Sequence, residues 1–142
     1  HLLHTGGLNT HAFLGGIANN FASNLLLGDV LKEGYLVAEA DEYDRSFLRL
    51  SPEVAVVTST EADHLDIYGT AQSVTDTFAE FAGKVKAGGA LIAHVATDLP
   101  LAALAAQGIR TFTFGLEAGD YRAERIRQIG DTSVFDFTHY LP

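Results

Sequence analysis

Two short acidic segments carry the residue types in this sequence that are best suited to chemistry. The first acidic segment, "VAEADEYDRSF" at 37–47, places four carboxylates within six positions. The second acidic segment, "TEADHLDIYG" at 60–69, repeats the arrangement and adds a histidine. Each segment follows a short apolar run, so both are expected where a buried strand ends.

Carboxylates at the ends of parallel strands suit a divalent cation. In open parallel sheets, ligands bind beyond the carboxyl ends of the strands. Mg²⁺ and Mn²⁺ prefer oxygen ligands, and Mg²⁺ is commonly held by one or two carboxylates together with water and substrate phosphates. If the two strands are neighbours, Glu39 and the loop at 61–66 would face one crevice. The sequence therefore favours a Mg²⁺ or Mn²⁺ site there.

Ordinary structural roles remain open for the same residues. Glu39 could equally cap backbone amides at the end of its strand or pair with Arg45. Asp41 and its acidic neighbours could be the usual charges of a loop or a helix start. His64 could be a hydrogen-bonded structural residue, because imidazole more often selects zinc, copper or iron than magnesium. Residue types alone leave these roles undecided.

Alternating strand and helix patterns form the framework that must position the two segments. Apolar runs at 35–40 and 54–58 are typical of neighbouring parallel strands covered on both faces. An amphipathic pattern predicts a helix over 70–86. The next elements are a strand at 90–96, a helix at 97–108 that begins at Thr97 or Asp98 and ends at Gly108, and a strand at 109–115. This order predicts parallel βαβ units.

The two ends of the chain have a different character. Residues 1–7 read as the last turn of a helix, a short strand follows from residue 10, and 17–33 has no assignable pattern. The glycine pairs at 6–7, 15–16 and 88–89 read as helix stops and turns. Alternating patterns at 121–129 and 132–137 predict an antiparallel hairpin. The predicted fold is α/β, a mostly parallel sheet with flanking helices, in a single domain over 1–142.

Composition narrows the classes of function. With 142 residues, 47% of them apolar, the chain can bury a core. A net charge of -9 is the wrong sign for nucleic acid or an anionic membrane surface. The chain has no cysteine for a thiolate site and no phosphate-loop motif G-x-x-x-x-G-K-[ST]. It also has no methionine, and we expect it to be an internal part of a longer protein.

The two segments together resemble a known family. "GYLVAEADEYDRSFLRLSPEVAVVTSTEADHLDIYGT" is similar to the central domain of the Mur ligases, ATP-dependent enzymes of peptidoglycan precursor synthesis, and the likeness extends over essentially the whole chain. It is most similar to the branch that joins L-alanine to UDP-N-acetylmuramate in the bacterial cytoplasm. The resemblance implies a P-loop-type domain truncated before residue 1, without its phosphate loop and both flanking domains.

The resemblance also implies roles for individual residues. Glu39 and His64 fall on the positions of the Mg²⁺ (or Mn²⁺) ligands, and Asp63 and Asp66 match a D-H-[LM]-D motif that orients the histidine. Further residues near the metal or substrate would be Asp41, Thr58, Ser59 and Glu61. Ser59 stands where asparagine is common, and Tyr43 stands where serine is expected. No lysine lies in 70–83, so a carbamylated lysine is not expected.

The implied partners are ATP as co-substrate, UDP-N-acetylmuramate and L-alanine, with no nucleic acid and no membrane. Two alternatives stay open. A related ligase that recycles a murein tripeptide shares "EADEYD", and the chain could also be a non-catalytic module that binds divalent metal. We expect the 142-residue chain alone to bind metal weakly and to be inactive, because ATP has no phosphate loop here.

Overall fold

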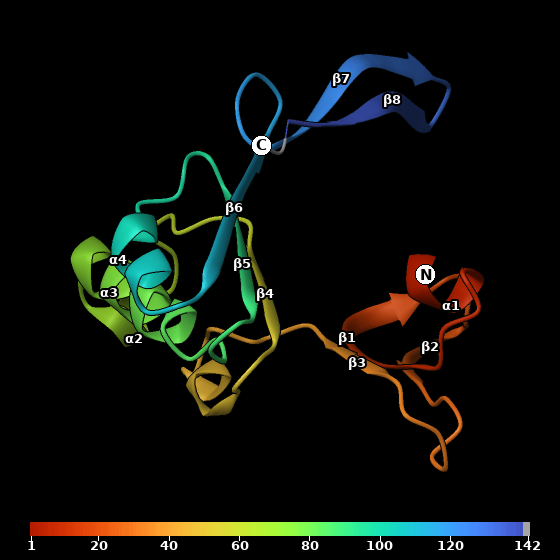
Figure 1. The fold of residues 1–142 in the computed structure, drawn as a ribbon, viewed down its shortest axis with the longest axis horizontal. Helices are drawn as coiled ribbons and strands as arrows, with labels where there is room; N and C mark the ends of the chain where they lie inside the picture. The colour runs from red at the N-terminus through yellow and green to blue at the C-terminus, as the bar shows by residue number, and fades with distance from the viewer. Residues whose placement is uncertain (141–142) are drawn as a thin grey trace. The chain divides into compact units, whose positions relative to one another are not determined.

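The computed structural model describes residues 1–140 and divides the chain into two compact units, His1–Asp44 and Arg45–Pro142 (Figure 1). The division falls inside the first acidic segment. Its composition gives no sign of a linker, because the residues there are charged and aromatic and include no proline or glycine.

The first unit is a three-stranded sheet with one short helix. Its elements are α1 (Leu2–Thr5), β1 (Thr10–Ala18), β2 (Ser23–Leu26) and β3 (Tyr35–Ala38). The strand order is β2-β1-β3, with β2 antiparallel and β3 parallel to β1. The predicted helical turn at the N-terminus is present. The unassigned stretch at 17–33 contains β2, which folds back onto β1.

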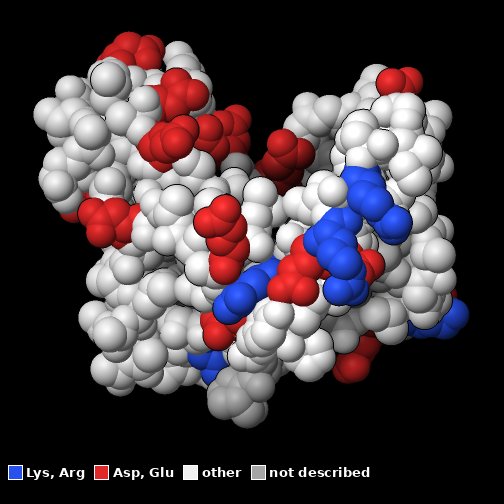
Figure 2. Space-filling model, turned by 90° about the horizontal axis from the view of Figure 1, so that it is seen from above, with Lys and Arg blue, Asp and Glu red and all other residues white. Residues whose placement is uncertain are grey.

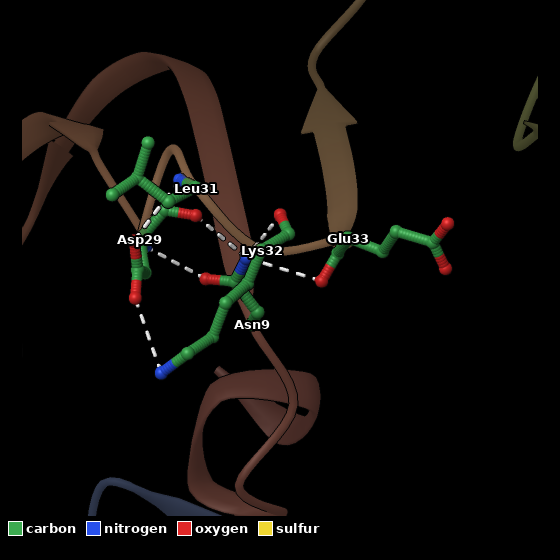
Figure 3. Close-up of polar contacts among 5 residues, drawn as sticks. All are labelled: Asn9, Asp29, Leu31, Lys32 and Glu33. Atoms are coloured by element: carbon green, nitrogen blue, oxygen red, sulfur yellow. Dashed lines mark hydrogen bonds and ion pairs between the residues drawn. The ribbon is translucent and has the colours of Figure 1, made fainter.

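The loop between β2 and β3 is held by the side chain of Asn9 (Figure 3). Its amide nitrogen Nδ2 donates to the carbonyl oxygens of Asp29, Lys32 and Glu33 at 3.0, 3.0 and 3.2 Å. Its Oδ1 accepts the backbone N–H of Asp29 at 2.8 Å. One side chain thus supplies hydrogen bonds that the loop backbone cannot make in a sheet.

Two glycines leave the space that the Asn9 side chain occupies. A Cβ atom on Gly34 would lie 2.7 Å from Nδ2 of Asn9, and one on Gly28 would overlap Oδ1 of Asn9. The loop also fixes a charge: the backbone N–H of Leu31 and the ammonium of Lys32 lower the pKa of the Asp29 carboxyl. The loop is therefore ordered by side chain to backbone contacts.

The second unit is a five-stranded sheet with helices. Its elements are η1 (Ser46–Arg49), β4 (Val54–Val57), α2 (Leu65–Tyr68), α3 (Ala71–Ala82), β5 (Ala90–His94), α4 (Leu101–Ala106), β6 (Arg110–Gly115), β7 (Tyr121–Ile129) and β8 (Thr132–His139). The strand order is β4-β5-β6-β7-β8. All pairs are parallel except the β7–β8 hairpin. The predicted α/β class, mostly parallel sheet and C-terminal hairpin are confirmed.

The core of this unit lies between the sheet and its helices. Figure 1 shows α2, α3 and α4 together on one side of β4, β5 and β6. Leu91 of β5 and Val74 of α3 are almost fully buried, and Phe47 of η1 packs against Phe81 with ring centroids 4.9 Å apart. Helix α3 begins at the N-cap Thr70, whose hydroxyl accepts the N–H of Ser73. The predicted amphipathic helix is therefore confirmed.

The expected start of α4 is wrong. Its N-cap is Pro100, and neither Thr97 nor Asp98 caps it. The Thr97 hydroxyl instead donates to the His94 carbonyl oxygen, which closes a turn after β5. A residue before proline is disfavoured in the helical conformation, which favours a helix that starts after Leu99. At the other end Gly108 has a φ of +85°, as expected for a helix stop.

Strands β3 and β4 depart from the prediction in partner and in burial. They were expected to be neighbours, but β3 pairs with β1 and β4 pairs with β5 in a separate sheet. They were expected to be covered on both faces, but β3 is exposed throughout and β4 alternates, with Val54 and Val56 each 57% exposed. An apolar run rich in valine and alanine favours strand conformation. Which strand it pairs with, and which residues cover its faces, depend on residues distant in sequence.

The β7–β8 hairpin carries interspersed charges. Arg125 forms an ion pair with Asp136, and the Tyr140 hydroxyl donates to the Glu124 carboxylate at 2.6 Å. That bond lowers the pKa of Glu124 and raises the pKa of Tyr140. Figure 2 shows basic and acidic side chains next to one another on the face of the molecule seen from above. Within residues 1–140, no helix is long and apolar enough to cross a membrane.

We expect Asn9→Ala to lower the free energy of unfolding by about 1–3 kcal/mol, because the loop loses the hydrogen bonds of that side chain. Amide hydrogen exchange should locate the effect in 28–34, above all at the Asp29 N–H. Asn24→Ala is the control, since Asn24 is an exposed asparagine of the same unit. Equal exchange at Asp29 in both variants would contradict the role of Asn9.

Candidate functional site

The β1–β3 pairing places Glu39 against Gly15. The parallel register sets Phe13 beside Ala38, and the next bond runs from the Glu39 N–H to the Phe13 carbonyl oxygen at 2.8 Å. The Gly15 N–H then donates to Oε2 of the Glu39 carboxylate at 2.8 Å. The Glu39 side chain thus caps a backbone amide at the end of its strand, while the residue itself remains exposed.

The rest of the first acidic segment turns away from strand geometry. Oδ1 of Asp41 accepts the backbone N–H of Tyr43 at 2.9 Å, a local bond typical of a turn. Within the second unit, the guanidinium of Arg45 lies over the ring of Tyr68, 4.7 Å from its centroid, and reaches the hydroxyl of Ser73 at 3.5 Å. The bond to the Tyr43 N–H gives Asp41 a structural role in its own turn, in addition to any role in binding.

The second acidic segment begins in a loop that hydroxyl groups organise. Ser59 Oγ accepts the backbone N–H of Glu61 at 3.0 Å. Thr60 Oγ1 accepts the N–H of Asp98, from the turn after β5, at 3.3 Å. The serine that replaces the expected asparagine therefore serves its own turn. Thr58 and Glu61 are exposed in the same loop, directly after β4.

His64 lies at the N-cap of α2 in a strained conformation. Its φ of +53° and ψ of 42° are in the left-handed region, which is uncommon for a residue with a large side chain. Asp63 Oδ1 accepts the His64 backbone N–H at 2.7 Å, and the same oxygen lies 3.9 Å from the ring nitrogen Nδ1. The imidazole is 31% exposed. Strain of this kind is concentrated at functional sites.

The predicted site residues are divided between the two units. Glu39 and Asp41 belong to the first unit, and the second holds Thr58, Ser59, Glu61, Asp63, His64 and Asp66, the last in the first turn of α2. A single metal ion held by both Glu39 and His64 therefore stays a prediction. Across residues 1–140, no group of three or more His, Asp or Glu side chains could hold a metal. A Mg²⁺ site needs fewer protein ligands, because water and substrate phosphates complete the coordination shell.

Gly15 is a residue of this site that the sequence patterns do not predict. The glycine pair at 15–16 predicts a turn, but both glycines lie within β1. The signal was their position inside a strand pattern, where glycine often marks the close approach of another group. The sequence does not show that the approaching group is the Glu39 carboxylate, because the two residues meet only through the β1–β3 pairing.

Comparison with known proteins assigns the chain to a family. Residues 3–141 match the Mur ligase middle domain. The chain is 44% identical over 135 residues to a UDP-N-acetylmuramate–L-alanine ligase of Phocaeicola vulgatus, covering 95% of this chain and 28% of that protein. It is 45% identical over 127 residues to the protein of the same name from Cytophaga hutchinsonii, covering 89% and 27%. The chain thus spans less than a third of these relatives.

Solved structures support the same fold. The chain superposes with a TM-score of 0.73 on UDP-N-acetylmuramate-alanine ligase from Thermotoga maritima, at 23% identity, covering 99% of this chain and 31% of that one. It gives the same TM-score with UDP-N-acetylmuramate:L-alanyl-gamma-D-glutamyl-meso-diaminopimelate ligase from Neisseria meningitides, at 24% identity, covering 97% and 46%. At these identities the likeness concerns the fold alone.

We expect His64→Gly to be more stable than His64→Ala by about 1 kcal/mol, because both lose the imidazole and only glycine adopts a positive φ without strain. Urea denaturation of the two variants measures the difference. The control is the same pair of substitutions at Gln72, an exposed residue of α3. Within a helix glycine is less favourable than alanine, so Gln72→Gly should be less stable than Gln72→Ala. Equal stability of the two His64 variants would show that the backbone relaxes at this position.

Proposed function

The chain belongs to the Mur ligase family, and from this premise we propose that it is part of the middle domain of a UDP-N-acetylmuramate–L-alanine ligase. The alanine-adding relatives at 44% and 45% identity support this choice. Since the chain spans less than a third of them, the activity is that of the whole protein. We assign it to the bacterial cytoplasm, with ATP as co-substrate.

The proposed reaction forms an amide in two steps. The muramoyl carboxylate attacks the γ-phosphorus of ATP, which breaks the bond to ADP and gives an acyl phosphate. The amine of L-alanine then attacks the acyl carbon, so that phosphate leaves, the amide forms and the amine loses a proton. Both steps bring anionic groups together, and catalysis in such reactions rests on positioning and on neutralising charge.

The identity to alanine-adding ligases carries the proposal, and the metal role that we propose for Glu39 rests on its carboxylate, which a backbone amide holds at the end of β3. Its hard oxygen atoms fit Mg²⁺ or Mn²⁺, and Mg²⁺ accepts as few as one or two carboxylates beside water and phosphates. His64 is the less typical ligand, because imidazole is commoner around zinc, copper and iron. When bound, the divalent cation neutralises phosphate charge in the reaction.

Asp63 and Thr60 fix the loop that carries His64. Asp63 accepts the His64 backbone N–H and so fixes the start of α2. Thr60 ties the loop to Asp98. These bonds limit the conformations of the loop before any ligand binds, which reduces the entropy lost on binding. For Asp41, Thr58, Ser59, Glu61 and Asp66 we propose supporting contacts to metal or substrate.

The competing function within the family is addition of a tripeptide in place of L-alanine. The likeness to the Neisseria meningitides structure concerns the fold alone and does not favour it. Phosphate release by the whole ligase, measured with UDP-N-acetylmuramate, ATP and either amine, separates the two. Release that depends on L-alanine supports the proposal, and release only with the tripeptide selects the alternative.

We expect Glu39→Gln to lower kcat/KM of the whole ligase on the order of 10²-fold, because a neutral amide binds the divalent cation more weakly than a carboxylate does, and the cation neutralises phosphate charge. Mn²⁺ affinity, followed by electron paramagnetic resonance, should fall with it. The matched control is Glu33→Gln in the same unit. The Glu33 carboxylate points away from the contacts drawn in Figure 3.

Wild-type turnover and Mn²⁺ affinity in Glu39→Gln would refute the assignment of Glu39 to the metal. An equal loss in Glu33→Gln would show instead that general surface charge is responsible. His64→Ala is the second probe: if His64 is a metal ligand, that variant must also weaken Mn²⁺ binding.

A further inference from the structure

We propose that Gly15 is a positioning residue for the Glu39 carboxylate. It would act in two ways: its N–H orients the carboxylate, and its missing side chain leaves the space in which the carboxylate lies. This inference rests on the proposed function of Glu39 as a metal ligand. It concerns a residue outside both acidic segments.

The hydrogen-bond ladder explains why Gly15 meets this side chain. In a parallel ladder, a residue donates its N–H to one residue of the neighbouring strand and accepts at its carbonyl from the residue two positions further on. Glu39 donates to Phe13, so the next donor is the Gly15 N–H. That N–H donates to the Glu39 carboxylate Oε2 at 2.8 Å. The Glu39 carboxylate thus accepts the hydrogen bond that the Glu39 backbone carbonyl would accept if the ladder continued.

The absence of a side chain at Gly15 matters to the Glu39 carboxylate, as does the hydrogen bond from the Gly15 N–H. A Cβ atom on Gly15 would lie 2.9 Å from Glu39 Oε1, 3.1 Å from Cδ and 3.3 Å from Oε2. A Cβ atom on the adjacent Gly16 would meet nothing within 4 Å. Neither glycine is among those with a positive φ, so backbone conformation does not explain the glycine at 15. The atoms that would be displaced belong to the Glu39 carboxylate and not to the backbone.

A fixed carboxylate is a better ligand than a free one. A glutamate side chain loses rotamer entropy when it is immobilised, and here part of that loss already occurs on folding, before the metal binds. The bond occupies Oε2 and leaves lone pairs on both oxygens, because an ionised carboxylate has about four acceptor sites. Groups that orient metal ligands typically change metal affinity 10- to 100-fold when they are mutated.

The test compares Gly15→Ala with Gly16→Ala in the whole ligase. We expect Gly15→Ala to weaken Mn²⁺ binding about tenfold, measured by electron paramagnetic resonance, and to raise the KM for metal by a similar factor while kcat at saturating metal changes little. Gly16→Ala should match the wild type. Both variants should unfold at the wild-type temperature, because only the flexible end of Glu39 must move.

A double-mutant cycle with Glu39→Gln distinguishes positioning from a structural role. If Gly15 acts through the carboxylate, Gly15→Ala should cause no further loss of Mn²⁺ affinity in the Glu39→Gln background. An equal loss in both backgrounds, equal affinities of Gly15→Ala and Gly16→Ala, or a Gly15→Ala protein that does not fold would each overturn the proposal. Unchanged Mn²⁺ affinity in Glu39→Gln alone would refute the proposed metal role itself.

Discussion

Parallel pairing of short strands is the constraint on which both acidic segments depend. The β1–β3 ladder sets the register that brings Glu39 to Gly15. In the second unit, β4 pairs with β5 in parallel. The second acidic segment follows β4 and contains α2, and α3 then leads the chain back to β5. The connection from β4 to β5 is a long crossover of the kind that parallel neighbours usually have, because a two-residue turn joins only antiparallel strands. The helices that pack against the sheet therefore also position the loop after β4, which carries the second acidic segment.

Where the strands end, side chains take over the hydrogen bonding of the backbone. Glu39 accepts from Gly15, Ser59 from Glu61 and Asp63 from His64. Each bond satisfies an amide that the ladder or helix leaves without a partner. At His64 such a bond accompanies a left-handed residue, a conformation that persists only where its surroundings enforce it. The same polar residues that suit a metal or substrate thus also shape the loops that present them.

Helices and hairpins whose apolar residues recur at a regular spacing could be predicted from the sequence. The spacing of apolar residues predicts the amphipathic helix at 70–86 and the hairpin at 121–137. The structure confirms both elements, although the helix ends earlier than expected, at Ala82. Strand β2 was missed because its short run has no clear alternation. The partners of β3 and β4 and the exposure of Val56 could not be predicted, because pairing and cover depend on residues distant in sequence. The site residues were identified by family resemblance, whereas their contacts required the fold.

The first unit uses glycine for space more than for conformation. Gly15, Gly28 and Gly34 have no positive φ, yet a Cβ atom on any of them would press on the side chain of Glu39 or on Asn9. In each case the crowded side chain makes a hydrogen bond to the backbone of a neighbouring segment. A polar side chain that lies flat against the backbone needs a position without a Cβ, and a sequence reading that treats glycine as a turn signal overlooks this requirement. The Asn9 contacts hold a loop, whereas the Glu39 contact holds a charged group with free lone pairs. The same device therefore serves the fold in one place and, by our proposal, ligand positioning in the other.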